Sequence, residues 1–161
     1  MIRLSHISSH VSSSTNLLSS ASVKDFSTEI VSKVQKSVVQ TMDAPQAIGP
    51  YVQGVKYNGL VYTSGQIGLN KEGQLLATTI QEQSEQVMMN LKAVLIGANS
   101  GMDRIIKVTC FLKDMNDFAE FNKIYASHLF AGDLPARSCV EVSRLPKDVL
   151  VEVECVAIVY E

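Results

Sequence analysis

One short segment of this chain places a permanent cation and a thiol at a spacing that brings them together. Leu134–Val142 opens with a proline at its second position, which suits the start of a β-strand. Arg137, Cys139 and Glu141 then follow at every second position, so they are expected on one face of that strand. The other face, which can cover a core, takes Ala136, Ser138, Val140 and Val142.

Arg137 is suited to binding a small carboxylate, because a guanidinium donates two parallel hydrogen bonds to the two carboxylate oxygens. An ordinary surface salt bridge is the alternative. The positive charge would also lower the pKa of the Cys139 thiol, which permits a reactive thiolate. A half-buried cysteine that lines a pocket is the commoner role, and both roles stay open at this point.

The last predicted strand, Val149–Tyr160, carries two carboxylates on a face whose other residues are apolar. Glu152 and Glu154 share this face, and the opposite face is continuously apolar. A carboxylate on an apolar surface must find a partner or have its pKa raised. A carboxyl group with a raised pKa is a candidate for moving protons in catalysis. The alternative is a partly solvated face with two ordinary surface charges.

The other reactive residue types exclude several classes of site. After residue 41 the chain has one histidine, His128, so a catalytic triad or a metal site built on histidines is excluded. The cysteines lack CxxC spacing, which argues against a zinc site and a disulfide framework and fits a reducing compartment. They are Cys110, Cys139 and Cys155. Ser64 has no neighbouring base in the sequence, so we interpret it as a hydrogen-bonding residue.

The charge of the chain argues against binding to nucleic acid. From Met42 onward there are ten Lys and Arg residues against fourteen Asp and Glu residues, a net charge of −4. Affinity for phosphates needs clustered cations, which this balance does not favour. No apolar run approaches the ~20 residues of a membrane span, so no membrane partner is predicted.

Residues 1–41 differ in composition from residues 42–161. The first part holds twelve serines and the second part six, and the first acidic residue is Asp25. Ser-rich, acid-poor N-termini are typical of organelle transit segments, so we expect a mitochondrial protein, with a plastid or the cytoplasm as alternatives. Apolar residues recur at every fourth position in Val23–Gln40, which predicts a short helix. That helix could serve targeting or dock on the body of the protein.

The body contains clear signals for strands and helices. Asn58-Gly59 predicts a hairpin that joins Tyr51–Tyr57 to Leu60–Gln66. Gly65 interrupts the second strand, which indicates a bulge or a close approach of the backbone. The other predicted elements are a helix over Thr78–Ala98, a strand over Arg104–Leu112, a helix ending near Phe130, and strands over Ala136–Val142 and Val149–Tyr160.

These elements alternate in a way that predicts the α+β class. A mixed sheet of five to six strands with two helices on one face satisfies their order. Asp117 is expected to cap the second helix, with Glu120 in the capping-box position. The uncovered face of the sheet also carries apolar residues, so we expect an oligomer that packs sheet against sheet.

Five segments of the body together resemble one known family. They are, in the family's order, Ala47–Tyr51, Thr63–Ile67, Lys113–Phe118, Pro135–Val140 and Leu145–Asp148. Over residues 42–161 the chain is similar to the Rid (YjgF) family of reactive-intermediate imine deaminases, and within it to the RidA subgroup, which keeps an arginine at the position of Arg137. The compact members of that family lack a Ser-rich leader such as residues 1–41.

The resemblance implies a chorismate-mutase-like fold assembled as a homotrimer, with the sheets facing inward and the active sites between subunits. It implies hydrolysis of 2-imino acids, such as 2-iminobutanoate and 2-iminopropanoate, to 2-oxo acids and ammonia without a metal or organic cofactor. Pyridoxal-phosphate-dependent dehydratases release such substrates. By this resemblance Arg137 grips the substrate carboxylate and Glu152 positions or activates water. The residues that match the pocket lining are Tyr51, Ser64, Gly65, Ile67, Asn122 and Cys139.

Two other functions stay open at this point. A trimer that binds 2-oxo acids through Arg137 without turnover would be a small-molecule-binding regulator, and it would tolerate Gln in place of Glu152. Some family members carry the label of ribonuclease or translation inhibitor. The acidic body and the single histidine after residue 41 argue against that label here.

Overall fold

The computed structural model describes residues 35–129 and 133–160, which form an α+β fold. Within these residues a seven-stranded sheet has the order β1-β2-β3-β7-β5-β6, and the short β4 also pairs with β7. The strands are β1 (Ser37–Val39), β2 (Gly54–Tyr57), β3 (Leu60–Thr63), β4 (Gln66–Ile67), β5 (Ile105–Leu112), β6 (Ala136–Glu141) and β7 (Val151–Ile158). The helices are α2 (Ile80–Gly97) and α3 (Phe118–His128), and short 3-10 turns cover Met102–Arg104, Met115–Asp117 and Pro146–Asp148.

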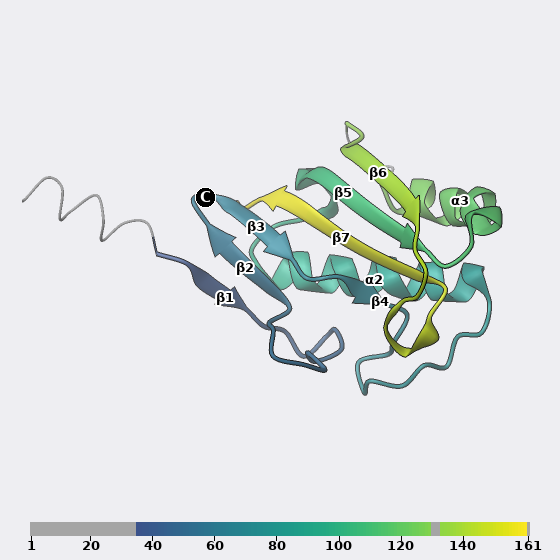
Figure 1. Cartoon of the computed structure of the whole chain (residues 1–161). Coiled ribbons are helices and arrows are strands. Elements are labelled where there is room, and N and C mark those ends of the chain that lie inside the picture. The colour runs from purple at the N-terminus through teal and green to yellow at the C-terminus, as the bar shows by residue number, and fades with distance from the viewer. Residues whose placement is uncertain (1–34, 130–132, 161) are drawn as a thin grey trace, which may run out of the picture. The chain divides into compact units, whose positions relative to one another are not determined.

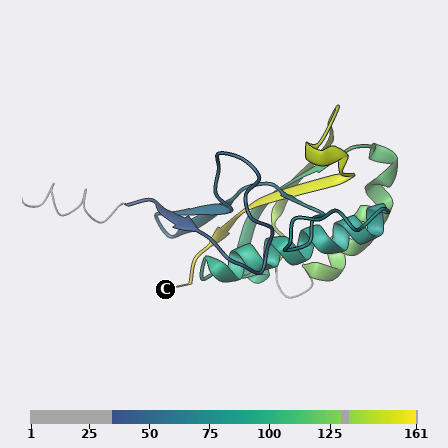
Figure 2. The ribbon, with the colours of Figure 1, turned by 90° about the horizontal axis from the view of Figure 1, so that it is seen from below.

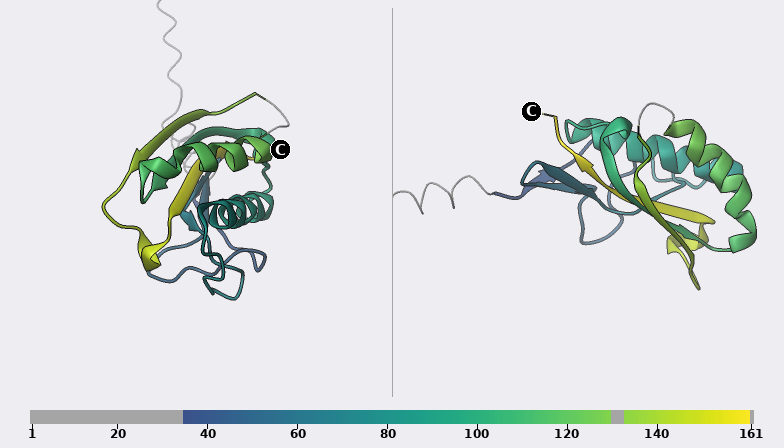
Figure 3. Two further views of the ribbon diagram at one scale, coloured as in Figure 1. Left: turned by 90° about the vertical axis from the view of Figure 1, so that its right-hand side faces the viewer. Right: turned by 90° about the horizontal axis from the view of Figure 1, so that it is seen from above.

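Both helices lie on one face of the sheet, as Figure 1 and Figure 2 show, and Figure 3 gives the same layering from two further sides. The described strand pairs are antiparallel except β5 and β6, which run parallel. The predicted α+β class with two helices on one face is confirmed. The sheet exceeds the predicted five to six strands because β1 and the two-residue β4 also pair. No helix in the two described ranges is long and apolar enough to cross a membrane.

The core lies between the sheet and α2, and its pattern follows from the sequence. Along β7 the side chains of Val151, Val153, Cys155 and Ala157 are buried, whereas Glu152, Glu154 and Val156 are half-buried on the opposite face. The helix covers the buried face with an apolar stripe at helical spacing: Val87, Met88, Leu91, Val94 and Leu95. The alternation predicted for the last strand is therefore confirmed.

The hairpin and the first long helix form where the sequence predicts them. Asn58 and Gly59 have φ angles of 51° and 76°, and positive φ at both central residues is the geometry of a type I′ turn. Thr79 and Glu82 form a capping box at the start of α2: the Thr79 hydroxyl accepts the Glu82 amide at 3.2 Å, and the Glu82 carboxylate accepts the Thr79 amide at 3.1 Å. Both signals are local, so they do not depend on the rest of the fold.

The structure corrects the prediction for the segment before residue 42. Ser37–Val39 is strand β1, which pairs antiparallel with β2, whereas the spacing of apolar residues predicts a helix there. Val39 is buried and Val38 is exposed, because extended backbone sends neighbouring side chains to opposite faces while it pairs with the edge of β2. The folded body thus begins before the boundary expected at Met42. Residues 1–34, with the predicted transit segment and the rest of the predicted helix, lie outside the described residues.

The start of α3 also differs from the prediction. The Asp117 side chain makes no capping hydrogen bond, and Glu120 instead contacts a lysine one turn later. Two other carboxylates satisfy the amides at the preceding 3-10 turn: Asp114 accepts an amide two residues on, and Glu141 of β6 accepts the Met115 amide at 2.8 Å. A capping box is not required there because the first amides are already paired.

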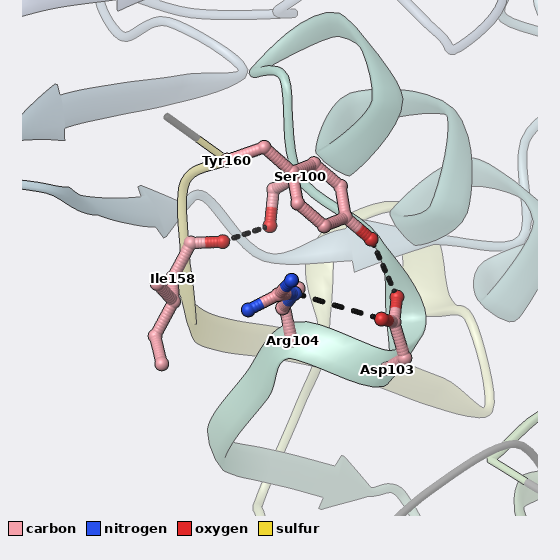
Figure 4. Close-up of polar contacts among 5 residues, drawn as sticks. All are labelled: Ser100, Asp103, Arg104, Ile158 and Tyr160. Carbon is pink, nitrogen blue, oxygen red and sulfur yellow. Dashed lines mark hydrogen bonds and ion pairs between the residues drawn. The ribbon is translucent and has the colours of Figure 1, made fainter.

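Polar contacts among five residues fix the end of β7 to the start of β5 (Figure 4). The Tyr160 hydroxyl donates to Asp103 Oδ1 at 2.8 Å, and the guanidinium of Arg104 lies 4.5 Å from the centre of the Tyr160 ring. The Ser100 hydroxyl donates to the Ile158 carbonyl at 2.7 Å. These contacts hold β7, the strand with the two glutamates, in register with β5.

Buried Asn90 connects α2 to the segment that follows β4. Its Nδ2 donates to the carbonyls of Ile67 at 3.0 Å and Leu69 at 2.8 Å, and its Oδ1 accepts from Gln86 at 2.9 Å. The Asn90 residue is only 2% exposed, so water has little access to these groups. The side chain therefore anchors the chain where it leaves β4.

We expect Asn90→Ala to lower the free energy of unfolding by about 2–4 kcal/mol, because two buried carbonyls lose their donor. Asn116→Ala, at an exposed position, is the matched control and should change it by less than about 0.5 kcal/mol. Denaturation in urea, followed by circular dichroism, measures both variants. If the free energy of unfolding of Asn90→Ala equals that of wild type, the anchoring role of Asn90 is contradicted.

Candidate active site

Contacts from α3 hold the Arg137 side chain in place. Its Nη1 donates to Asn122 Oδ1 at 2.8 Å. The guanidinium carbon lies 4.6 Å from the centre of the Tyr125 ring and 5.5 Å from that of Phe118. These three α3 residues lie on one face of the helix because they are spaced by four and three positions. The hydrogen bond and the two cation–π contacts therefore orient the guanidinium.

Arg137, Asn122 and Tyr125 also line a cavity of about 350 Å³. Its other walls are apolar, from Ala126, Leu134 and Pro135. Nη1 of Arg137 donates its hydrogen bond to Asn122, whereas Nε and Nη2 donate none within the described part of the chain. This edge of the guanidinium can take a carboxylate in a bidentate manner. We call this cavity the arginine half-site.

The face of β6 that covers the core is the opposite of the one that the sequence predicts. Arg137 and Cys139 point to the helix side, where Cys139 packs against the core. The residues that the pattern assigns to the core are exposed on the other face: Ala136, Ser138 and Val140. The grouping by alternation is thus correct, but the core lies under the other group. β6 is the last strand beside α3, so the Arg137 stem and the Cys139 thiol close the core there.

A second cavity, of about 510 Å³, gathers most of the other predicted site residues. The predicted residues that line it are Tyr51, Ser64, Gly65, Ile67 and Glu152. The wall is completed by Ile48, Thr63, Pro146 and Glu154. We call this cavity the glutamate half-site. Among residues 35–129 and 133–160, no group of three or more His, Cys, Asp or Glu side chains is arranged to hold a metal ion.

The backbone at Gly65 passes directly over Glu152. A Cβ atom at position 65 would overlap the Glu152 carboxylate, so any side chain there would displace it. The close approach predicted from this glycine is confirmed. Beside it, the Ser64 hydroxyl donates to the Val52 carbonyl at 2.5 Å, which agrees with a hydrogen-bonding role.

The environment of Glu152 raises the pKa of its carboxyl group. Burial raises the pKa of Glu152 above its ordinary value of 4.5, and the charge of Glu154 raises it further. Its carboxylate accepts no hydrogen bond from a side chain within the residues that the structure describes, so both oxygens are available to a ligand or to water. A carboxyl group in this state can hold a water molecule and exchange a proton with it.

Arg137 and Glu152 lie on opposite faces of the sheet within one chain. Phe111 of β5 is the register partner of both Glu152 and Val140, so these side chains share one face. Val140 is three residues from Arg137, an odd spacing that puts the two on opposite faces of β6. The arginine and glutamate half-sites also share no lining residue. One chain therefore presents two separate half-sites.

Two residues that contact the Arg137 guanidinium were not predicted as site residues. Phe118 and Tyr125 are expected from the sequence only as inward-facing residues of the second helix. Their spacing from Asn122, four and three residues, is the signal that could have placed all three beneath Arg137. Cys139 is on the same face of β6 as Arg137, two residues away, as predicted.

Comparison with known proteins identifies the family. The profile of the family described as endoribonuclease L-PSP matches residues 41–159, nearly all of the described body. The chain belongs to the Rid (YjgF) family. The resemblance seen in the five sequence segments is thereby confirmed.

Individual Rid proteins are similar over most of their length. AldR of Lactococcus lactis, whose name assigns it provisionally as a regulator, is 53% identical over 121 residues, which cover 74% of this chain and 95% of AldR. TdcF of Escherichia coli K12, provisionally a reactive intermediate deaminase, is 42% identical over 125 residues, covering 76% of this chain and 97% of TdcF. The crystal structure of E. coli TdcF with bound serine has a TM-score of 0.74 at 41% identity and covers 77% of this chain and 99% of TdcF. Yeast Mmf1 has a TM-score of 0.76 at 43% identity, over 78% of this chain and all of Mmf1.

The raised pKa of Glu152 predicts a pH-dependent cost in stability. Between the ordinary pKa of 4.5 and the raised folded value, the folded state keeps a proton that the unfolded state releases. Stability therefore falls as pH rises through this interval and stays lower above it. We expect Glu152→Gln to raise the melting temperature at pH 8, with a difference from wild type that shrinks below pH ~4.5.

Glu72→Gln, at an exposed turn position, is the matched control and should follow wild type at every pH. Differential scanning calorimetry between acidic and alkaline pH gives the comparison. A melting temperature of Glu152→Gln below that of wild type at pH 8 would show that the ionised Glu152 carboxylate stabilises the fold, contrary to its environment.

Proposed function

We propose that this Rid protein hydrolyses 2-imino acids to 2-oxo acids and ammonia, at a site that two protomers of a homotrimer share. The observation that carries the proposal is the division of the site residues into two half-sites on opposite faces of one chain. The guanidinium of Arg137 is suited to a carboxylate, and Glu152 has a raised pKa. To act together on one small molecule, these two groups must come from different chains.

The open face of the sheet supplies a surface for that assembly. It carries apolar side chains that are half-buried or exposed in the single chain: Leu60, Tyr62, Ile106, Phe111, Val140, Val156 and Ile158. Packing these faces together would remove apolar area from water. Because the arginine and glutamate half-sites are different surfaces, their contact is head-to-tail, and such contacts form a ring where the rotation between neighbouring chains closes. A trimeric ring would contain three equal sites.

Arg137 would bind and orient the substrate. A 2-imino acid has a carboxylate next to an electrophilic C=N carbon, so clamping the carboxylate fixes the position of that carbon. Asn122 and the two aromatic rings hold the guanidinium plane, which makes the clamp rigid. Cys139, two residues along the strand, would lie at the nitrogen end of the bound molecule.

Glu152 would handle water and protons. Its carboxylate holds a water molecule against one face of the imine carbon and takes a proton as the oxygen attacks. The C–O bond forms and the C=N bond becomes a C–N single bond. Glu152 then returns the proton to the nitrogen, which gives a carbinolamine. A second transfer through Glu152 moves the hydroxyl proton to the same nitrogen, the C–N bond breaks as the C=O bond forms, and ammonia and the 2-oxo acid leave. A raised pKa suits this role, because both forms of the carboxyl group are then accessible nearer to neutral pH.

Two relatives support the substrate class. TdcF is named provisionally as a reactive intermediate deaminase, and its crystal structure contains serine, a small molecule with a carboxylate next to a nitrogen-bearing carbon. AldR, the regulator by name at 53% identity, favours the alternative of a trimer that binds 2-oxo acids without turnover. Binding and turnover by Glu152→Gln distinguish these functions. A binding protein would still bind 2-oxo acids, because it needs no proton transfer, whereas a deaminase would lose its rate.

Arg137→Ala should lower kcat/KM by about 100-fold or more, because the imine carbon is no longer held in position. A threonine dehydratase generates the 2-imino acid, and semicarbazide competes for it. Wild-type protein should suppress semicarbazone formation, as should Lys92→Ala, which removes an exposed cation on α2. Full activity of Arg137→Ala would contradict the proposed carboxylate-binding role of Arg137. Failure of the wild-type protein to compete with semicarbazide would contradict the deaminase proposal itself.

Mixing two inactive variants tests whether the site is shared. When Arg137→Ala and Glu152→Gln chains are unfolded together in equal amounts and refolded, a quarter of the interfaces should combine an intact Arg137 with an intact Glu152. We therefore expect about a quarter of wild-type activity from the mixture. Each variant refolded alone is the control and stays inactive. No recovery in a mixture shown by mass spectrometry to contain hybrid trimers would place both residues in one chain's site.

A further inference from the structure

Two of the three cysteines face each other across the only parallel strand pair described. Cys110 of β5 is the register partner of Cys139 of β6, and both side chains lie on the helix side of the sheet. Neighbouring strands are about 4.8 Å apart, inside the range of Cα separations that a disulfide spans. Both thiols are reduced in the structure. We infer that Cys110 and Cys139 form a peroxide-sensitive dithiol that closes to an intramolecular disulfide.

The surroundings assign different roles to the two thiols. Cys139 is half-buried and close to the Arg137 guanidinium, whose positive charge partly offsets the rise that burial causes in the pKa of its thiol. Cys110 is fully buried behind it. The accessible Cys139 is therefore the sulfur that meets an oxidant first, and Cys110 is the sulfur that resolves the product.

The reaction balances with one peroxide molecule. The Cys139 thiolate attacks one oxygen of hydrogen peroxide, the O–O bond breaks, and Cys139 becomes a sulfenic acid as hydroxide leaves. The Cys110 sulfur then attacks the Cys139 sulfur, the S–O bond breaks, and water leaves with the Cys110 proton. Two thiols are oxidised and the peroxide is reduced to two water molecules.

Burial sets the pace of both steps. It raises the pKa of Cys139 above its usual value despite Arg137, and it raises the pKa of Cys110 to about 12. The second step is therefore expected to be the slower one, so the sulfenic acid should persist long enough to be trapped.

The third cysteine is placed differently. Cys155 lies on β7, where its register partner is Val108 and its amide and carbonyl both contact the Thr63 hydroxyl. β7 pairs with strands on both sides, whereas β6 pairs on one side only within the described residues. Small shifts that bring two sulfurs into bonding distance are therefore easier at β6. The bond would form in the core beside the arginine half-site, two residues along β6 from Arg137.

Alkylation of the full chain with iodoacetamide under denaturing conditions counts the remaining thiols. Reduced protein should take up three labels and peroxide-treated protein one, with Cys110 and Cys139 joined in a tryptic peptide map and dithiothreitol restoring all three. Cys155→Ala is the matched control and should still form the disulfide. Cys110→Ala should instead accumulate a dimedone adduct at Cys139.

Several results would overturn the dithiol. These are a disulfide that involves Cys155, a disulfide between two chains, or three alkylated thiols after an exposure that oxidises glutathione in the same tube. If Cys110→Ala does not fold, Cys139→Ala at the half-buried edge position serves instead and must abolish the bond. None of these readouts depends on deaminase activity.

Discussion

The alternation of side chains across a single sheet governs the rest of this structure. A strand sends neighbouring residues to opposite faces, and here one face is covered by α2 and α3 while the other is open. Glu152 of β7 lies on the open face and Arg137 of β6 lies on the covered face. No movement of a side chain can bring them together through a paired sheet. A function that needs both residues therefore needs a second chain.

The two half-sites differ in how the fold holds them. The arginine half-site is made rigid by contacts with α3, because one hydrogen bond and two aromatic rings orient the guanidinium. The glutamate half-site depends on backbone geometry, because Gly65 leaves room for the Glu152 carboxylate. Asn90 and the contacts around Tyr160 support that second half from a distance, since they fix the segment after β4 and the register of β7. The same fold thus combines a preformed clamp with a partly buried, unpaired carboxyl group.

The apolar open face and the division of the site into two half-sites both call for a second copy of the chain. Residues such as Val140 and Phe111 are unfavourable in water on a single chain. Burying them against another copy would remove that apolar area from water. The parallel pairing of β5 and β6 has a second consequence, because it sets Cys110 beside Cys139 close to the clamp. Substrate binding and thiol chemistry would then take place on the same short strand.

Much of the fold could be predicted from the sequence because its signals are local. Asn58-Gly59 requires two positive φ angles, and Gly65 marks a close approach of the backbone. The alternation along β7 predicts its buried face, and it gives a raised pKa of Glu152 as one of the outcomes for a carboxylate beside apolar residues. Local signals failed where a distant partner decided the outcome. Ser37–Val39 became a strand because the edge of β2 was available, and Asp117 lost its capping role because Asp114 and Glu141 satisfy the same helix start.

The sequence alone determined the class, the family and the types of side chain that could act on a small carboxylate. It also determined which residues of β6 share a face, since alternation is a property of the backbone. Only the tertiary structure decided which of those faces the core covers, because that depends on where α3 packs. For the same reason only the tertiary structure separated Arg137 from Glu152, which a list of site residues brings together. Spacing along the chain is local chemistry, whereas the side of a sheet that becomes buried is set by contacts between distant segments.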